Sequence, residues 1–206
     1  MSIVATCRCG QKFSASPQLA GKQVREIAEP HSDMILSLEF SPDGKYLATG
    51  AADRFMKTWD VETGKLVRTF EGHTHHVLGV TWSADGRTLA SCGADKVIKV
   101  WDFRSGDQKR TISGFAKQVT AIRFLADTAN VAASCGDTNV HVRNTDNGAG
   151  VRTLSGSTDF VYCIAASADG KTLLAGGQDS VLRIWNDNGQ VQAAFQAPKP
   201  DQTAAK

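Results

Sequence analysis

Residues 77–102 read VLGVTWSADGRTLASCGADKVIKVWD, and this stretch decides the fold. Within it, Leu78, Val80 and Trp82 alternate with smaller or polar residues, which is typical of a strand buried on one face. Asp-Gly and Gly-Ala-Asp-Lys sequences separate three such runs and predict tight turns. A fourth run follows at 108–112. The sequence therefore predicts a small antiparallel sheet of four strands.

This pattern recurs with a period of 42 residues. Several series keep the step, above all Asp53, Asp95, Asp137 and Asp179. A fixed period of this length indicates a repeat architecture, in which each unit buries its apolar faces against its neighbours. We expect an all-β fold of four antiparallel, four-stranded blades, with repeats at about 31–72, 73–114, 115–156 and 157–196.

Composition excludes some classes of partner. The chain has 206 residues, a net charge of +2 and scattered Lys and Arg, so we expect no nucleic acid and no anionic membrane as partner. No apolar stretch approaches the ~18 residues that cross a bilayer. The cysteines inside the repeats (Cys92, Cys135 and Cys163) are interpreted as buried free thiols, which predicts a reducing, cytoplasmic compartment.

The repeats resemble the WD-repeat β-propeller family over about residues 31–196. The matching motifs are Trp59-Asp60, Trp101-Asp102, the near-match Trp185-Asn186, Gly72-His73 and Ser41-Pro42-Asp43-Gly44. The resemblance implies a propeller that serves as a non-enzymatic scaffold for a protein partner.

The resemblance also implies a hydrogen-bonded tetrad of His, Ser or Thr, Asp and Trp in each blade. These places are taken in the first repeat by His31, Thr49, Asp53 and Trp59, and in the second by His73, Ser91, Asp95 and Trp101. The tetrads resemble catalytic triads in composition. The family likeness makes them buried structural groups, so we expect no enzyme and no catalytic residue.

The last two repeats depart from this pattern. The third keeps Asp137 but has Phe115, Ala133 and Arg143 at the other places, and the fourth keeps Asp179 and Trp185 but has Ser157 and Ala175. We expect these two blades to depend on strand pairing and apolar packing, and to be less rigid.

Residues 1–22 form a segment that resembles the first half of a small bacterial zinc ribbon, truncated and poorly ordered. Cys7 and Cys9 are the candidate metal ligands, but the second cysteine pair of such a ribbon is missing. A structural zinc site takes four ligands. The alternative function is thus a metal- or redox-responsive dimerising module, in which two chains share one zinc through these cysteines; otherwise we expect no cofactor.

Domain boundaries follow from these patterns. The propeller segment is predicted at 23–196, and 21–27 repeats the fourth-strand sequence at 64–70, as if a ribbon-like start had been joined to a propeller in mid-blade. The polar and proline-containing stretch 197–206 is predicted to be a disordered tail.

Propellers bind partners through loops at the rim of the central channel, and this analogy of fold supplies the candidates for partner binding: Arg54, His75, His76, Lys96 and Lys117. Four blades of a ring that usually has about seven cover little more than half a circle. We therefore expect an open arc, or a ring completed by dimerisation, which would make the chain a homodimer.

Overall fold

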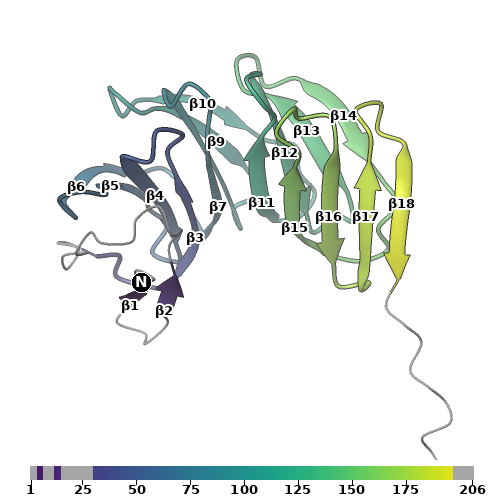
Figure 1. Cartoon of the computed structure of the whole chain (residues 1–206), viewed down its shortest axis with the longest axis horizontal. Helices are drawn as coiled ribbons and strands as arrows, with labels where there is room; N and C mark the ends of the chain where they lie inside the picture. Colours follow the sequence, from purple (N-terminus) through teal and green to yellow (C-terminus); the bar gives the residue numbers. More distant parts are fainter. Residues whose placement is uncertain (1–3, 7–11, 15–29, 197–206) are drawn as a thin grey trace, which may run out of the picture.

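The computed structural model describes residues 4–6, 12–14 and 30–196. In these ranges every regular element is a β-strand (Figure 1), and no helix is long and apolar enough to cross a membrane. The first two strands, β1 (Val4–Thr6) and β2 (Lys12–Ser14), pair with each other in antiparallel fashion.

In the described range 30–196, sixteen further strands form four antiparallel sheets, each of four strands that follow one another in the chain. The first blade contains β3 (Ile35–Phe40), β4 (Tyr46–Ala51), β5 (Met56–Asp60) and β6 (Leu66–Phe70). The second contains β7 (Val77–Trp82), β8 (Thr88–Gly93), β9 (Ile98–Asp102) and β10 (Gln108–Ile112). The third contains β11 (Val119–Phe124), β12 (Asn130–Cys135), β13 (Val140–Asn144) and β14 (Gly150–Leu154). The fourth contains β15 (Val161–Ala166), β16 (Leu173–Gly177), β17 (Val181–Trp185) and β18 (Val191–Gln196).

The turn between the first and second strands of a blade is closed by a short side chain. Asp43 accepts hydrogen bonds from the Ser41 hydroxyl at 2.6 Å and from the Lys45 amide at 3.1 Å. Gly44 has a φ of 71°, a conformation that side chains with a Cβ rarely adopt. The second and fourth blades repeat this arrangement at Asp85 and Asp169.

The core lies between the blades, which pack face against face. Met56 and Phe70 of the first blade meet Val80 and Trp82 of the second. Comparable clusters join the second blade to the third and the third to the fourth. Each fully buried side chain of this size contributes about 1.5–3 kcal/mol relative to exposure. The strand pattern and the four blades expected from the sequence are confirmed.

An arginine on the outer strand of each of the first three blades links it to the next blade. Arg68 donates to the carbonyl of Arg104 at 2.8 Å, and Arg110 to that of Asp146 at 2.6 Å. Arg152 donates to the carbonyl of Asp187 in the same way. The corresponding residue of the fourth blade is Ala193, which pairs with Ile184 in the sheet and carries no donor.

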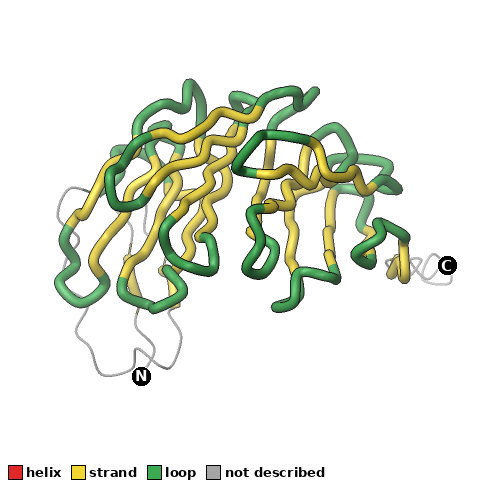
Figure 2. Tube along the Cα trace, turned by 90° about the horizontal axis from the view of Figure 1, so that it is seen from above, coloured by secondary structure: helices red, strands yellow, loops and turns green. Residues whose placement is uncertain are grey.

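Figures 1 and 2 show the four blades along an arc, with the first and last at opposite ends. Within the described residues the arc does not close, which agrees with the partial propeller expected from the sequence. The two end faces are therefore not packed against another blade of the described chain.

Candidate functional site

The second blade contains a continuous chain of hydrogen bonds through its sheet. His73 Nδ1 lies 2.8 Å from the Asp95 carboxylate, and Nε2 lies 2.8 Å from the Ser91 hydroxyl. The Trp101 indole N–H donates to the same hydroxyl at 2.9 Å. The carboxylate thus accepts a hydrogen bond from Nδ1–H, Nε2 accepts one from the serine hydroxyl, and the serine oxygen accepts one from the indole N–H. The imidazole, the hydroxyl and the indole thus all have partners in this chain of bonds, whereas Asp95 Oδ1 is buried and has none.

The first blade brings together the corresponding four residues. His31 Nδ1 lies 2.8 Å from Asp53, and Nε2 lies 2.7 Å from the Thr49 hydroxyl, which accepts from Trp59 at 2.9 Å. Burial lowers the pKa of His31, against the opposing hydrogen bond and charge of Asp53. The imidazole is therefore held neutral near pH 7.

In the third and fourth blades, the aspartate at the same place of the repeat has a different hydrogen-bond partner. In the fourth, Arg183 Nη1 lies 2.6 Å from Asp179 and 3.3 Å from the Ser157 hydroxyl. In the third, His141 Nε2 lies 2.9 Å from Asp137. The expectation that these blades depend only on strand pairing and apolar packing is wrong, because a cation or imidazole on the third strand replaces the missing histidine.

Three residues of the third blade differ from those of the other repeats, and of these Phe115 contacts both His141 and Arg143. Phe115 stands where the other tetrads have histidine, and its ring meets that of His141 edge-on at 5.3 Å. The guanidinium carbon of Arg143, which stands in the place of the tryptophan, lies over the same phenyl ring at 5.3 Å from its centroid. The sequence signal for a partner of the aspartate on the third strand is that residues 57, 99, 141 and 183, at the same place in the four repeats, are Lys, Lys, His and Arg.

The tetrads of the first and second blades lie inside the sheets, where they link neighbouring strands. Ser91 is fully buried and Thr49 nearly so, and both hydroxyls are already engaged by an imidazole and an indole. A nucleophile must reach a substrate in solution. Neither hydroxyl can do so without disrupting the sheet.

All five partner-binding candidates lie on one edge of the blades, at turns. Arg54 and Lys96 occupy the same place in successive turns between second and third strands, with φ of 75° and 64°. His75, His76 and Lys117 lie in the loops that enter the second and third blades. Four of the five side chains are exposed, and His76 is half-buried. The Lys117 ammonium group lies 5.0 Å from the centroid of the Phe160 ring.

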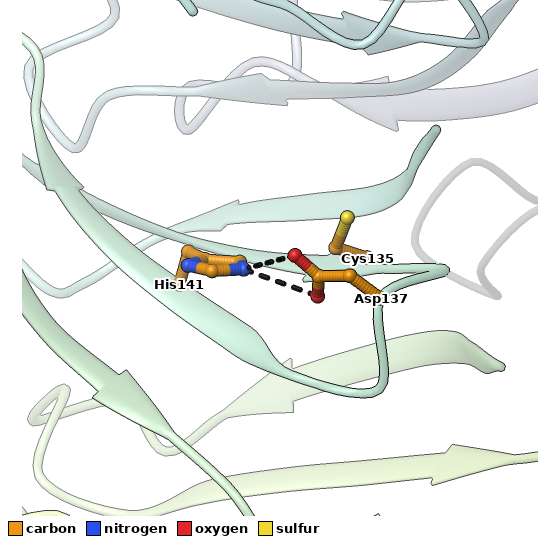
Figure 3. A group of neighbouring side chains, drawn as sticks. All are labelled: Cys135, Asp137 and His141. Atoms are coloured by element: carbon orange, nitrogen blue, oxygen red, sulfur yellow. Dashed lines mark hydrogen bonds and ion pairs between the residues drawn. The ribbon is translucent and has the colours of Figure 1, made fainter. Parts of the chain in front are cut away.

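A cluster not considered in the sequence analysis lies in the third blade. Cys135 at the end of β12, Asp137 in the following turn and His141 on β13 bring their ligand atoms within 4.8 Å of one another (Figure 3). Cys135 is fully buried, and its thiol lies 3.4 Å from the Lys117 carbonyl. Burial raises the pKa of this thiol. The spacing Cys-x-Asp-x-x-x-His across one hairpin is the signal that the sequence offered.

Other predictions fall outside the described residues. Cys7 and Cys9, the repeat-like stretch 21–27 and the tail 197–206 all do so. The zinc-ribbon likeness, the shared zinc and the disordered tail thus stay predictions.

The description "WD domain, G-beta repeat" matches residues 21–60, 64–102 and 148–186, which together make up more than half of the chain. The chain belongs to the WD40 repeat family. Repeats of this family generally mediate protein–protein interactions, and WD40 proteins are typically non-enzymatic scaffolds. The third blade of this WD40 chain, with its altered tetrad places, lies mostly between the matched ranges.

Curated relatives match this WD40 chain over segments of about the length of one repeat. The general transcriptional corepressor TUP1 of Saccharomyces cerevisiae is 52% identical over 46 residues, which is 22% of this chain and 6% of that protein. Ribosome biogenesis protein BOP1 homologs are 44% identical over 43 residues in Aedes aegypti and 39% identical over 41 residues in Drosophila virilis. Those segments cover 21% and 20% of this chain, and 5% of each relative.

Proposed function

We propose that this WD40 chain is a non-enzymatic scaffold for protein–protein interaction, and that a second copy of the chain is its first partner. Family membership supports the scaffold role. The choice of partner rests on the two end faces of the arc. They expose apolar residues at the same places of the repeat that are buried between neighbouring blades elsewhere in the chain.

The outer face of the last blade exposes residues that the other blades bury. Leu182 and Phe195 are 42% and 58% exposed. The corresponding pairs in the first three blades are at most 3% exposed: Met56 and Phe70, Ile98 and Ile112, and Val140 and Leu154. These three pairs pack against the following blade. The last blade thus presents the same apolar set with no following blade in the described chain.

At the other end, the first blade exposes the complementary set. Leu38 is 39% exposed, whereas Val80 and Ile122, at the same place in the second and third blades, are fully buried against the preceding blade. Each chain therefore carries both halves of its own internal junction. Contiguous exposed apolar surface of this kind is typical of interaction sites.

Two copies can cover both faces at once. If the last blade of each meets the first blade of the other around a two-fold axis, two arcs of four blades make a ring of about eight, within the range of known propellers. Both interfaces are then of the same kind as the internal junctions.

Light scattering after size-exclusion chromatography tests this proposal. We expect the mass of a dimer for the wild-type chain and of a monomer for the double variant Leu182→Glu/Phe195→Glu. Val151→Glu is the matched control, because Val151 is 49% exposed on an outer strand of an interior blade. A wild-type monomer, or a dimer that survives the double variant, would overturn the choice of partner.

A gain-of-function variant sharpens the experiment. Ala193→Arg supplies the missing arginine, which would reach the carbonyl of Glu62 in the other copy as Arg68 reaches Arg104. Each added hydrogen bond from a charged donor contributes about 1–1.4 kcal/mol, and the two-fold dimer gains two of them, so the dimer should become tighter by about 25-fold to 100-fold. Ala194→Arg, one residue along the strand and on the opposite face, should not strengthen it. Cys7→Ser/Cys9→Ser should leave the dimer intact, whereas a zinc-sharing dimer would dissociate.

The loop edge that carries Arg54, Lys96 and Lys117 is the candidate surface for other partners. Its positive charges favour an acidic segment of a protein partner. Charge reversal of these three residues should weaken capture of an acidic peptide without changing the mass of the scaffold. We expect the scaffold to work in the cytoplasm.

A further inference from the structure

We propose that Cys135, Asp137 and His141 form a binding site for one divalent transition-metal ion of the zinc type. The proposal is independent of the scaffold role, and rests on what distinguishes the third blade from its three neighbours.

The aspartate of this cluster is held in the same way in several blades. Asp53, Asp137 and Asp179 each accept a hydrogen bond of 3.1 Å from the amide two residues later. The acceptor of this bond is Oδ1 in each of the three blades. What approaches Oδ2 differs: an imidazole from the preceding loop in the first two blades, a guanidinium group in the fourth.

Two substitutions surround Oδ2 with metal ligands in the third blade only. His141 stands where the other blades have Lys57, Lys99 and Arg183, and its Nε2 is 2.9 Å from Asp137 Oδ2. Cys135 stands where the others have Ala51, Gly93 and Gly177. A lysine or arginine can only pair with the carboxylate. Imidazole, thiolate and carboxylate are together the ligand types that zinc prefers.

The three groups are positioned by their surroundings before any ion binds. Figure 3 shows the imidazole on β13 and the carboxylate in the turn before it facing each other, with Cys135 at the end of β12, just before the turn. The Asn139 amide holds Asp137, the Phe115 ring packs against the imidazole, and Cys135 is fully buried. Preorganised ligands lower the entropic cost of binding.

Distances are compatible with a tetrahedral ion after small rotations. Bonds of about 2.0–2.3 Å place two donors of one zinc ion roughly 3.2–3.7 Å apart. The imidazole and carboxylate at 2.9 Å must separate by a few tenths of an ångström, and the thiol, within 4.8 Å, must approach.

Hydrogen bonding in the cluster also favours a ligand role. Nδ1 of His141 is buried without a hydrogen-bond partner, so the pairing with Asp137 does not satisfy the imidazole as the tetrads satisfy theirs. When an ion takes the Nε2 lone pair, the ring proton moves to Nδ1 and the imidazole stays neutral. The thiol releases its proton to solvent, and the thiolate and carboxylate then balance the two charges of the ion.

Cobalt(II) is the probe, because a cobalt–thiolate bond gives charge-transfer absorption in the near ultraviolet. The protein is the full chain carrying Cys7→Ser/Cys9→Ser, which removes the predicted N-terminal ligands. We expect one Co²⁺ per chain with thiolate absorption, displaced by Zn²⁺, and a rise in Tm on addition of Zn²⁺. Absence of the thiolate band in this folded background would overturn the proposal.

Repeat-derived substitutions keep the variants folded. Cys135→Ala and His141→Lys introduce residues that the first and second blades already have at these places. Each should reduce Co²⁺ affinity by about 100-fold and Cys135→Ala should abolish the thiolate band. Cys163 lies outside the cluster and is exposed, so the buried thiol expected from the sequence was wrong at this position; Cys163→Ser should change neither the affinity nor the band. A band that persists in Cys135→Ala, or disappears in Cys163→Ser, would contradict the assignment. Circular dichroism confirms the fold of each variant.

Discussion

Arg183 Nη1 meets the Asp179 carboxylate at 2.6 Å in the fourth blade, at the place where His73 Nδ1 meets Asp95 at 2.8 Å in the second. His73 comes from the loop before the first strand of its blade and Arg183 from the third strand, β17, but both bind the aspartate at the same position of the repeat. A buried carboxylate without a cation or donor is costly. The aspartate of each blade has therefore kept a partner even where the histidine of the tetrad is absent.

Replacing Arg183 by Gln should destabilise the chain by about 2–3 kcal/mol, because it leaves the buried Asp179 carboxylate without its charged partner. Urea unfolding followed by tryptophan fluorescence measures the change. Lys109→Gln is the control, since the ion pair of Lys109 with Asp102 is exposed and should contribute less than about 0.5 kcal/mol. Equal losses in the two variants would refute the argument.

Much of this fold was predictable because the 42-residue period carries the same apolar alternation four times. The strands follow from alternation and the turns from Asp-Gly pairs, both of which are local signals. The partner of Asp137 was not predicted, because it depends on which residue of the opposite strand faces the turn. Register decides that, and in this blade it brings His141 to the carboxylate.

Ser91→Ala should destabilise the second blade by about 2 kcal/mol. The substitution removes the hydroxyl that accepts from Trp101 and donates to His73, so that two buried nitrogens lose their partners. The exposed Ser113→Ala is the matched control and should change the free energy of unfolding by less than about 0.5 kcal/mol. A neutral Ser91→Ala would mean that the tetrad contributes nothing to stability.

The tetrads were predicted from the sequence, whereas the cluster at Cys135 was not. Tetrad residues such as His73 and Asp95 lie 22 positions apart, and only the family pattern brings them together before the structure is known. The cluster at Cys135 belongs to no family pattern. Cys135 and His141 differ from the residues at the same places in the other repeats, whereas Asp137 does not. Only the hairpin that the three residues share brings their side chains together.

Arg110→Ala should loosen the junction between the second and third blades. The guanidinium group donates to the Asp146 carbonyl at 2.6 Å, and an exposed bond of this kind contributes about 1 kcal/mol. Hydrogen exchange should rise in the 144–150 turn of the third blade and remain unchanged in the first. Lys109→Ala, on the neighbouring position of the same strand, should have no such effect. Uniform acceleration in all blades would argue against a local link.

Stability should fall as the pH drops below about 6.5, the ordinary pKa of histidine, because burial lowers the pKa of His31 in the folded chain. The unfolded chain then binds the proton more tightly, so this contribution is complete above that pH and is lost as the pH falls through the folded pKa. Asp95, whose pKa is lowered by His73 against the opposing effect of burial, adds a loss at more acid pH.

Urea unfolding between about pH 7.5 and about pH 5 measures this slope. His31→Asn should make this slope shallower. The difference between the variant and the wild type reports on His31 alone, because the other titrating groups are present in both chains. One of these groups is Glu39, whose pKa is raised by burial. His75→Asn, at an exposed imidazole outside the tetrads, should preserve the wild-type slope. If His31→Asn keeps the full slope, the acid sensitivity arises elsewhere and the neutral imidazole in the first tetrad is not its cause.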